Sequence, residues 1–272
     1  RRRAAGRAHV EPRRRASPFN GGRAGLEVAV AAIVRFTADA SHELRTPVSI
    51  IRTTAELALR HRRDPEEYRT ALAEIGAHAR QMSELVNDLL VLARIDAGVE
   101  SHGRTSVDVT RVAVDADREI SELAVPRSIR IDLSLPPETL YVSADEISLR
   151  RLVFILLDNA VKYSQTGGKV GLRVRSEPLP DGTRMVVIDV CDEGIGIEPS
   201  EGARVFERFY RGSRARQHAP DGTGLGLAIA RTIVERYQGS ITVASPMSPN
   251  GTGCRATISL PLAANAPRIT VH

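Results

Sequence analysis

The sequence predicts an α+β protein in which a long helical hairpin precedes an α/β sandwich. Apolar residues recur at helical spacing over residues 26–100, whereas residues 101–265 mix β-branched strand segments with shorter helical ones. The hydrophobic content of 42% is typical of a globular protein, and 272 residues suffice for two modest domains. No segment approaches the roughly 20 apolar residues that span a bilayer, so we expect the chain to be soluble as given.

Residues 1–25 differ in composition from the rest of the chain. They carry eight Arg and one Glu, a local charge of +7 against +5 for the whole chain, which leaves −2 for residues 26–272. Because they contain almost no large apolar side chain, we expect this leader to be disordered. A basic leader can contact anionic lipid or nucleic acid. The interpretation that we favour is a solvated leader or the stub of a longer chain.

The first predicted helix runs from about residue 26 to residue 61. Its apolar stripe consists of Ile33, Phe36, Ala40, Leu44, Val48, Ile51, Ala55 and Ala58. Asp64, Pro65, Glu66 and Glu67 then provide an N-cap, a proline at the first helical position and two acids in the first turn of a second helix. This second helix is expected to end near Asp96–Gly98.

The stripe of the second helix consists of Leu72, Ile75, Ala79, Met82, Leu85 or Val86, Leu89 and Leu92. Two helices joined by a short loop cannot bury both stripes alone. Pairing of two hairpins as a four-helix bundle solves this, so we expect a homodimer. The alternative is a hairpin that packs on its own C-terminal domain.

The stretch SHELRTP at 41–47 lies in the middle of the first helix. At 100° per residue, His42 lies about 200° from the core-facing Ala40, on the solvent side, with Glu43 beside it. Pro47 lacks an amide hydrogen and crowds the carbonyl of Glu43, so a kink is predicted around His42–Glu43. The sequence therefore exposes an imidazole beside a carboxylate where the helix is weakened.

The second domain is predicted to contain one sheet with helices on one face. Strand-like segments lie at 128–135, 169–176, 184–191, 240–245 and 254–262. Helical segments lie at about 109–124, 144–163 and 225–237, and Ser143 with Glu146 suggests a capping box for the middle one. Residues 200–223 are polar, Arg-rich and contain glycine, so we expect a mobile loop or lid.

There are two glycine runs: DEGIGI at 192–197 follows a predicted strand, and DGTGLGLAIA at 221–230 runs directly into a predicted helix. Such runs bring backbone N–H groups close to a phosphate. The spacing G-x-G-x-G and the absence of a following βαβ unit argue against a Rossmann fold. Asp192 can accept a hydrogen bond from an exocyclic amine such as that of adenine. Asn159 offers an amide oxygen to a hard cation, with Lys162 and Tyr163 on the same helix face.

In order and spacing, these motifs resemble those of the two-component sensor histidine kinases over residues 30–262. SHELRTP is similar to the phosphoacceptor box, LLDNAVKYS (156–164) to the asparagine box, and DEGIGI to the first glycine box. FERFYR (206–211) resembles the phenylalanine-rich box and GTGLGLAI (222–229) the second glycine box. The resemblance implies a dimerisation and phosphoacceptor hairpin at 26–100, an ATP-binding domain of the GHKL (Bergerat) type at 101–265, and a tail at 266–272.

The resemblance also implies roles for individual residues in an ATP-dependent protein-histidine kinase. His42 would accept the γ-phosphoryl group of ATP, Glu43 would polarise its imidazole, and Glu43 with Thr46 fits a regulator phosphatase pattern. Asn159 would bind Mg²⁺ and Asp192 would select adenine. The remaining nucleotide contacts would come from Lys162, Tyr163, Gly194, Gly196, Arg211, Gly222, Thr223, Gly224, Leu225 and Gly226. The phosphoryl group would pass to an aspartate on the receiver domain of a response regulator.

The sequence departs from the family pattern in two places. Ile155 stands where a second polar residue, commonly Asn, precedes the cation ligand by four positions, so Mg²⁺ would depend on Asn159, the phosphates and water. The family's usual sensor and membrane helices do not precede the hairpin. We therefore expect the cytoplasmic part of an inner-membrane sensor protein, attached to the membrane only through segments outside this chain. The alternative is a soluble kinase with another input.

Three other functions compete with this interpretation. A chaperone or topoisomerase ATPase module would share the glycine boxes but not SHELRTP on a hairpin. A degenerate, non-catalytic scaffold would bind a response regulator without phosphorylating it. A nucleic-acid binder would act through the leader and bind more tightly at low salt, but no nucleic-acid partner is expected.

The two cysteines, Cys191 and Cys254, form no disulfide framework and fit a reducing compartment.

Overall fold

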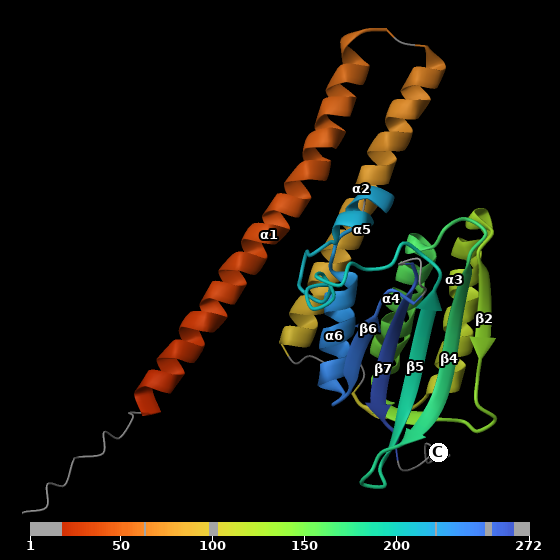
Figure 1. Ribbon diagram of the computed structural model, residues 1–272. Coiled ribbons are helices and arrows are strands. Elements are labelled where there is room, and N and C mark those ends of the chain that lie inside the picture. The colour runs from red at the N-terminus through yellow and green to blue at the C-terminus, as the bar shows by residue number, and fades with distance from the viewer. Residues whose placement is uncertain (1–17, 63, 98–102, 221, 248–251, 264–272) are drawn as a thin grey trace, which may run out of the picture. The chain divides into compact units, whose positions relative to one another are not determined.

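The computed structural model describes residues 18–62, 64–97, 103–220, 222–247 and 252–263 (Figure 1). By internal contacts the chain divides between His42 and Glu43 into two compact units. Among the described residues, no helix combines the length and the apolar character needed to cross a bilayer.

Helix α1 (Pro18–Arg60) begins earlier than the predicted residue 26. The prediction of disorder is therefore wrong for residues 18–25. Extending an existing helix forms one hydrogen bond for each residue that becomes ordered, so a weak helical sequence can continue a strong one, here up to a proline. Residues 1–17 of the predicted leader lie outside the described residues. The helix continues through Pro47, and the predicted kink there stays a prediction.

Helix α2 (Pro65–Asp96) begins and ends where the sequence predicts. The Asp64 carboxylate accepts hydrogen bonds from the backbone N–H groups of Glu66 and Glu67, each at 2.9 Å. The Glu67 carboxylate accepts in turn from the Asp64 N–H at 3.3 Å, which completes a capping box. The predicted N-cap is confirmed.

The second domain is built on a five-stranded sheet in the order β2-β4-β5-β7-β6, with β2 and β4 parallel and every other pair antiparallel. Its strands are β2 (Arg130–Ser134), β4 (Lys169–Pro178), β5 (Arg184–Asp192), β6 (Ser240–Ala244) and β7 (Cys254–Pro261). The helices α3 (Val109–Ala124), α4 (Glu146–Tyr163) and α6 (Gly226–Arg236) cover one face (Figure 1). The predicted sandwich is confirmed.

The core lies between this sheet face and the helices. Alternate residues of β4 point toward the helices and are buried, as the period of two requires: Val170, Leu172 and Val174. Helix α4 is buried on the opposing side through Leu149, Leu152, Val153, Leu156 and Leu157. This packing fixes the direction in which α4 and the end of β5 present their polar residues.

Three local features differ from the sequence-based prediction. The N-cap of α4 is Asp145, whose carboxylate accepts from the Ser148 N–H at 3.0 Å, and not Ser143. Ser143 belongs to β3 (Tyr141–Ala144), which pairs with β1 (Thr105–Asp108) in a small second sheet that the prediction missed. The predicted loop 200–223 contains the short helix α5 (Ser213–His218), and its mobility stays a prediction.

Candidate functional site

A cavity of about 750 Å³ lies where α4, the end of β5 and the start of α6 meet, within the unit that begins at Glu43. The motif residues that line it come from segments more than 60 positions apart: Asn159, Lys162, Tyr163, Asp192, Gly196, Arg211, Gly222, Thr223, Gly224 and Gly226. Most of the residues predicted to bind nucleotide are therefore brought together around one space.

Helix α4 supplies one wall of the cavity. Asn159, Lys162 and Tyr163 share a face because they are three and four residues apart. Burial raises the pKa of Asp158 on the same helix, and the nearby charge of Lys162 partly offsets this rise. Burial likewise raises the pKa of Tyr163, which the charge of Arg211 lowers in part. The wall thus combines a cation, an amide and two protonatable groups.

Asp192 ends β5 and points into the same cavity. Its carboxylate accepts a hydrogen bond from the Gly194 N–H at 2.9 Å. Burial raises the pKa of Asp192 to about 6, although the backbone N–H groups of Gly194 and Cys254 lower it in part. Cys254 also lines the cavity, and burial together with the Asp192 charge raises the pKa of its thiol to about 12.

Two glycines of the predicted motifs are required by close backbone contacts. A Cβ at Gly194 would lie 2.3 Å from the carbonyl oxygen of Tyr163, the same oxygen that accepts from the Ile195 N–H at 3.2 Å. Gly224 has φ +68°, and a Cβ there would lie 2.8 Å from the backbone of Phe209. The first contact ties the glycine run after β5 to the end of α4.

Not every predicted residue faces the cavity. Gly194 and Leu225 do not line it; Leu225 is fully buried at the start of α6. The guanidinium of Arg211 lines the cavity but donates to the carbonyls of Pro220 at 2.6 Å, of Ala215 at 3.3 Å and of Ala219. Arg211 therefore holds together the segment that precedes the second glycine run.

Helix α1 presents His42, Glu43 and Thr46 as exposed residues, with the ring of Pro47 buried. The predicted solvent-facing position of His42 is confirmed. Several apolar residues of the predicted stripes are exposed: Val48 is 47% exposed and Leu72 is 66% exposed, and Ala79 and Val86 are exposed as well. The hairpin thus leaves part of its predicted core surface uncovered.

The sequence analysis missed the polar residues that α2 contributes to the cavity. Glu84, Asn87 and Asp88 line it together with Arg151 of α4 and Arg214 of α5. Their spacing placed the α2 residues on the polar side of an amphipathic helix, which indicates exposure and does not indicate a neighbour. No local pattern could have identified them, because their neighbours come from distant parts of the chain.

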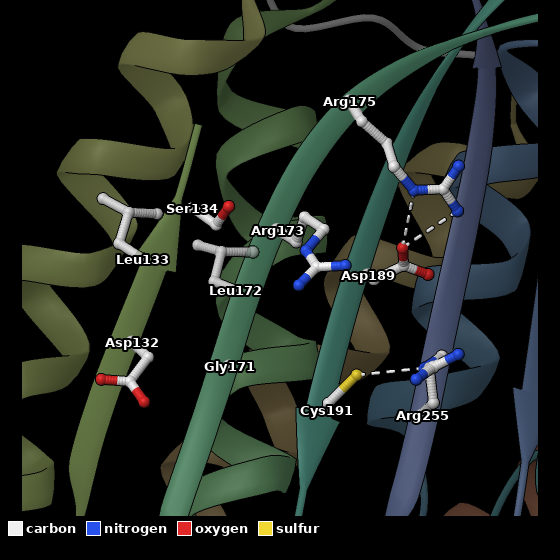
Figure 2. Close-up of a pocket in the computed structure, with 10 residues that line it drawn as sticks. All are labelled: Asp132, Leu133, Ser134, Gly171, Leu172, Arg173, Arg175, Asp189, Cys191 and Arg255. Atoms are coloured by element: carbon white, nitrogen blue, oxygen red, sulfur yellow. Dashed lines mark hydrogen bonds and ion pairs between the residues drawn. The ribbon is translucent and has the colours of Figure 1, made fainter. Parts of the chain in front are cut away.

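A second hollow, of about 450 Å³, lies on the opposite face of the sheet (Figure 2). Asp189 and Arg175 form an ion pair there at 3.1 Å, and Arg255 Nε donates to Cys191 Sγ at 3.2 Å. None of the predicted site residues lines this hollow. The candidate site is therefore the cavity on the helical side.

Two family models match the chain. Residues 32–98 match the His Kinase A (phospho-acceptor) domain, and residues 144–264 match the histidine kinase-, DNA gyrase B- and HSP90-like ATPase domain. The chain is 36% identical to sensor histidine kinase RppB of Synechocystis sp. over 84% of this chain and 49% of that protein. It is 39% identical to the histidine-protein kinase/phosphatase MprB of Mycobacterium ulcerans over 77% of this chain and 40% of that protein.

Among solved structures, the chain is similar to full-length ShkA in complex with AMPPNP. The TM-score is 0.57 at 28% identity, over 83% of this chain and 45% of ShkA. The chain spans about half or less of the length of these relatives. With its two domains in this order, the chain belongs to the two-component sensor histidine kinases, and it contains the phosphoacceptor and ATPase parts of their core.

Proposed function

We propose that this chain is an ATP-dependent protein-histidine kinase of a bacterial two-component system. The observation that carries the proposal is the cavity in which Asp192, Asn159 and both glycine runs converge, together with an exposed His42 on a separate helix. Phosphoryl transfer depends mainly on alignment and charge neutralisation. A nucleotide site and a nucleophile on different elements therefore suffice for this chemistry.

The cavity has the groups that an adenine nucleotide requires. The Asp192 carboxylate, held by backbone N–H groups, remains an acceptor for an exocyclic amine. Lys162 places a cation at the cavity, and Gly222, Gly224 and Gly226 line the cavity with residues that carry no side chain. These residues support ATP as the substrate.

Mg²⁺ fits the same wall through the amide oxygen of Asn159. The described residues contain no cluster of three or more His, Cys, Asp or Glu side chains arranged as metal ligands. Mg²⁺ does not require such a cluster, because it usually keeps several waters and is held by one or two protein ligands plus substrate phosphates. The ion would neutralise the charge on the transferring phosphate. We therefore propose Asn159 as the single protein ligand.

In the proposed reaction, a ring nitrogen of His42 forms a bond to the γ-phosphorus while the bond to the β,γ-bridging oxygen breaks and ADP leaves. The Glu43 carboxylate accepts a hydrogen bond from the N–H of the His42 ring. This keeps the lone pair of the other ring nitrogen directed at phosphorus. The phosphoryl group then passes to an aspartate of a response regulator. Glu43 and Thr46 support an opposing activity, in which water hydrolyses the aspartyl phosphate of the response regulator, and the relative MprB is named a histidine-protein kinase/phosphatase.

We propose a homodimer formed by the hairpin. The large apolar side chains that α1 and α2 expose after His42, namely Val48, Leu57, Leu59, Leu72, Val86 and Leu90, support it. The domain limits 26–100 and 101–265 and the origin as the cytoplasmic part of an inner-membrane sensor are proposals of the same kind. The partial coverage of the relatives supports the latter.

The test is incubation with γ-labelled ATP and Mg²⁺ followed by acid and alkali treatment. Label on His42 is expected to be acid-labile and alkali-stable, and His42→Gln is expected to abolish it. His61→Gln is the matched control, because it removes another exposed histidine at the end of α1 and is expected to leave labelling unchanged. Label that persists in His42→Gln would show that the nucleophile is wrongly assigned. Regulator binding without any label would indicate a scaffold.

A further inference from the structure

Asp88 of α2 reaches into the candidate nucleotide cavity and contacts two other elements there. Its carboxylate accepts from Arg151 Nη2 of α4 at 2.6 Å and from Thr223 Oγ1 of the second glycine run at 3.2 Å. Only 19% of the Asp88 side chain is exposed, against 47% for Asp96, the α2 carboxylate that pairs with Arg208. A helix outside the sandwich thus places a negative charge inside the cavity.

The surroundings of Asp88 contain another acid and a cation that is not fully paired. Burial raises the pKa of Asp88, and the charge of Arg151 and the Thr223 hydrogen bond lower it in part. The charge of Asp88 in turn raises the pKa of Asp158. Arg151 Nε is buried and has no hydrogen-bond partner among the described residues. Arg151 therefore has an N–H donor available for a ligand, and the negative charges of Asp88 and Asp158 repel each other.

We propose that Arg151 and Thr223 form a subsite for the terminal phosphate of the nucleotide, and that Asp88 is a carboxylate of the hairpin that occupies this subsite until nucleotide binds. The inference rests on the proposed ATP-binding function. It goes beyond that function by adding Arg151 to the binding residues and by assigning to α2 a direct part in nucleotide affinity.

The chemistry of the three groups supports the proposal. A guanidinium and a hydroxyl are donors that suit a phosphate as well as a carboxylate. Two anions cannot share them without strong repulsion, so the phosphate must displace the carboxylate. Arg151, Ile155 and Asn159 lie four residues apart on the cavity face of α4. Because Ile155 is apolar, Arg151 is the side chain before Asn159 on that face that can neutralise a phosphate, whereas Lys162 lies after Asn159.

Competition for one subsite couples the nucleotide to the position of α2. A nucleotide that displaces Asp88 weakens the hold of α2 on the second domain, and by linkage a bound α2 weakens the nucleotide by the same factor. The Asp96–Arg208 contact at 2.8 Å lies outside the cavity and is not affected by nucleotide. ADP lacks the terminal phosphate and leaves Asp88 in place. The triphosphate would therefore weaken the hold of α2 on the second domain, and the loss of the terminal phosphate after transfer would restore it.

The test measures the affinities of the full chain for AMPPNP and for ADP by calorimetry. Asp88→Asn keeps the shape but removes the charge, and it is expected to tighten AMPPNP binding about tenfold, within the usual range of coupling between sites, and to change ADP binding less than about twofold. Arg151→Gln is expected to weaken AMPPNP selectively. In the Arg151→Gln background, Asp88→Asn is expected to give no further gain, since the two act on one subsite.

Asp96→Asn is the matched control, because it removes the α2 carboxylate that pairs with Arg208 outside the cavity, and it is expected to leave both affinities unchanged. Thermal unfolding without nucleotide checks that each variant is folded. Equal effects of Asp88→Asn on AMPPNP and ADP, or no effect on either, would overturn the inference and leave the proposed kinase function intact. A wild-type chain that binds neither nucleotide would overturn both.

Discussion

Strand β5 carries two aspartates, three residues apart, that face opposite sides of the sheet. Asp189 points to the open face, where Arg175 Nη2 lies 3.1 Å away (Figure 2). The hydroxyl of Thr257 also donates to Asp189 at 2.6 Å. Asp192 points into the cavity on the helical face, where its carboxylate accepts from the backbone of Gly194 and Cys254. The two carboxylates share a strand and differ in what surrounds them.

The difference separates a structural carboxylate from one arranged to bind a ligand. The side chains around Asp189 neutralise its charge and use its acceptor sites. Neutral N–H groups around Asp192 orient the carboxylate without cancelling its charge, and burial raises its pKa to about 6. A buried carboxylate that no cation neutralises is well suited to accept a hydrogen bond from a ligand.

Exchanging each acid for its amide gives the largest expected contrast. Asp192→Asn is expected to weaken ATP binding about 100-fold, because the amide nitrogen presents donors toward the exocyclic amine of adenine. Asp189→Asn is expected to leave affinity within about twofold, because Asp189 lies outside the cavity. Calorimetry with ATP on both variants measures this. Equal losses in the two variants would show that the effect arises from the fold and not from the ligand contact.

The two substitutions are expected to change the free energy of unfolding in opposite directions. Because the folded protein holds the Asp192 proton more tightly than the unfolded chain, stability is lost as the pH rises from about 4 to about 6. Asp192→Asn removes that penalty and is expected to stabilise the nucleotide-free protein by on the order of 2 kcal/mol at pH 7. Asp189→Asn weakens an ion pair and is expected to destabilise it by about 1–3 kcal/mol.

Urea titration of the nucleotide-free variants at pH 7 and at pH 4 measures both effects. The advantage of Asp192→Asn is expected to be mostly lost at pH 4, where the folded carboxyl is protonated and the unfolded one is roughly half protonated. An Asp192→Asn variant that is less stable than the native chain at pH 7 would contradict the assigned burial penalty. It would show that Asp192, like Asp189, stabilises the fold.

The local parts of this comparison were predictable from the sequence, and the tertiary parts were not. The β5 strand and the glycine run after it follow from alternation and from backbone freedom, which are properties of neighbouring residues. Asp64 as N-cap is local in the same sense, and it was predicted correctly. The N-cap of α4 was assigned to Ser143, because the pairing of Ser143 with Ser106 depends on a strand 37 positions away.

The role of charged side chains was the least predictable part of the site. The resemblance placed Arg211 among the nucleotide contacts, but in the structure its guanidinium is bound to three carbonyls of its own segment. The sequence analysis did not single out Asp88 or Arg151, since an amphipathic pattern shows only which side of a helix is polar. Which partner a long polar side chain finds is decided by the packing of whole elements.

The smallest expected effect lies on the wall of the cavity that α4 provides. Ile155 lines the cavity, and its Cγ2 would lie 3.3 Å from a Cβ at Gly226. Ile155→Asn introduces an amide oxygen beside the proposed ion site of Asn159, so autophosphorylation is expected to stay the same or to rise by up to about threefold. Ile155→Val, which shortens the side chain without adding a polar atom, is the control. A sharp loss of activity in Ile155→Asn with an unchanged Ile155→Val would show that the apolar contact with α6 is required, and that this wall acts through packing while Asp192 acts through charge.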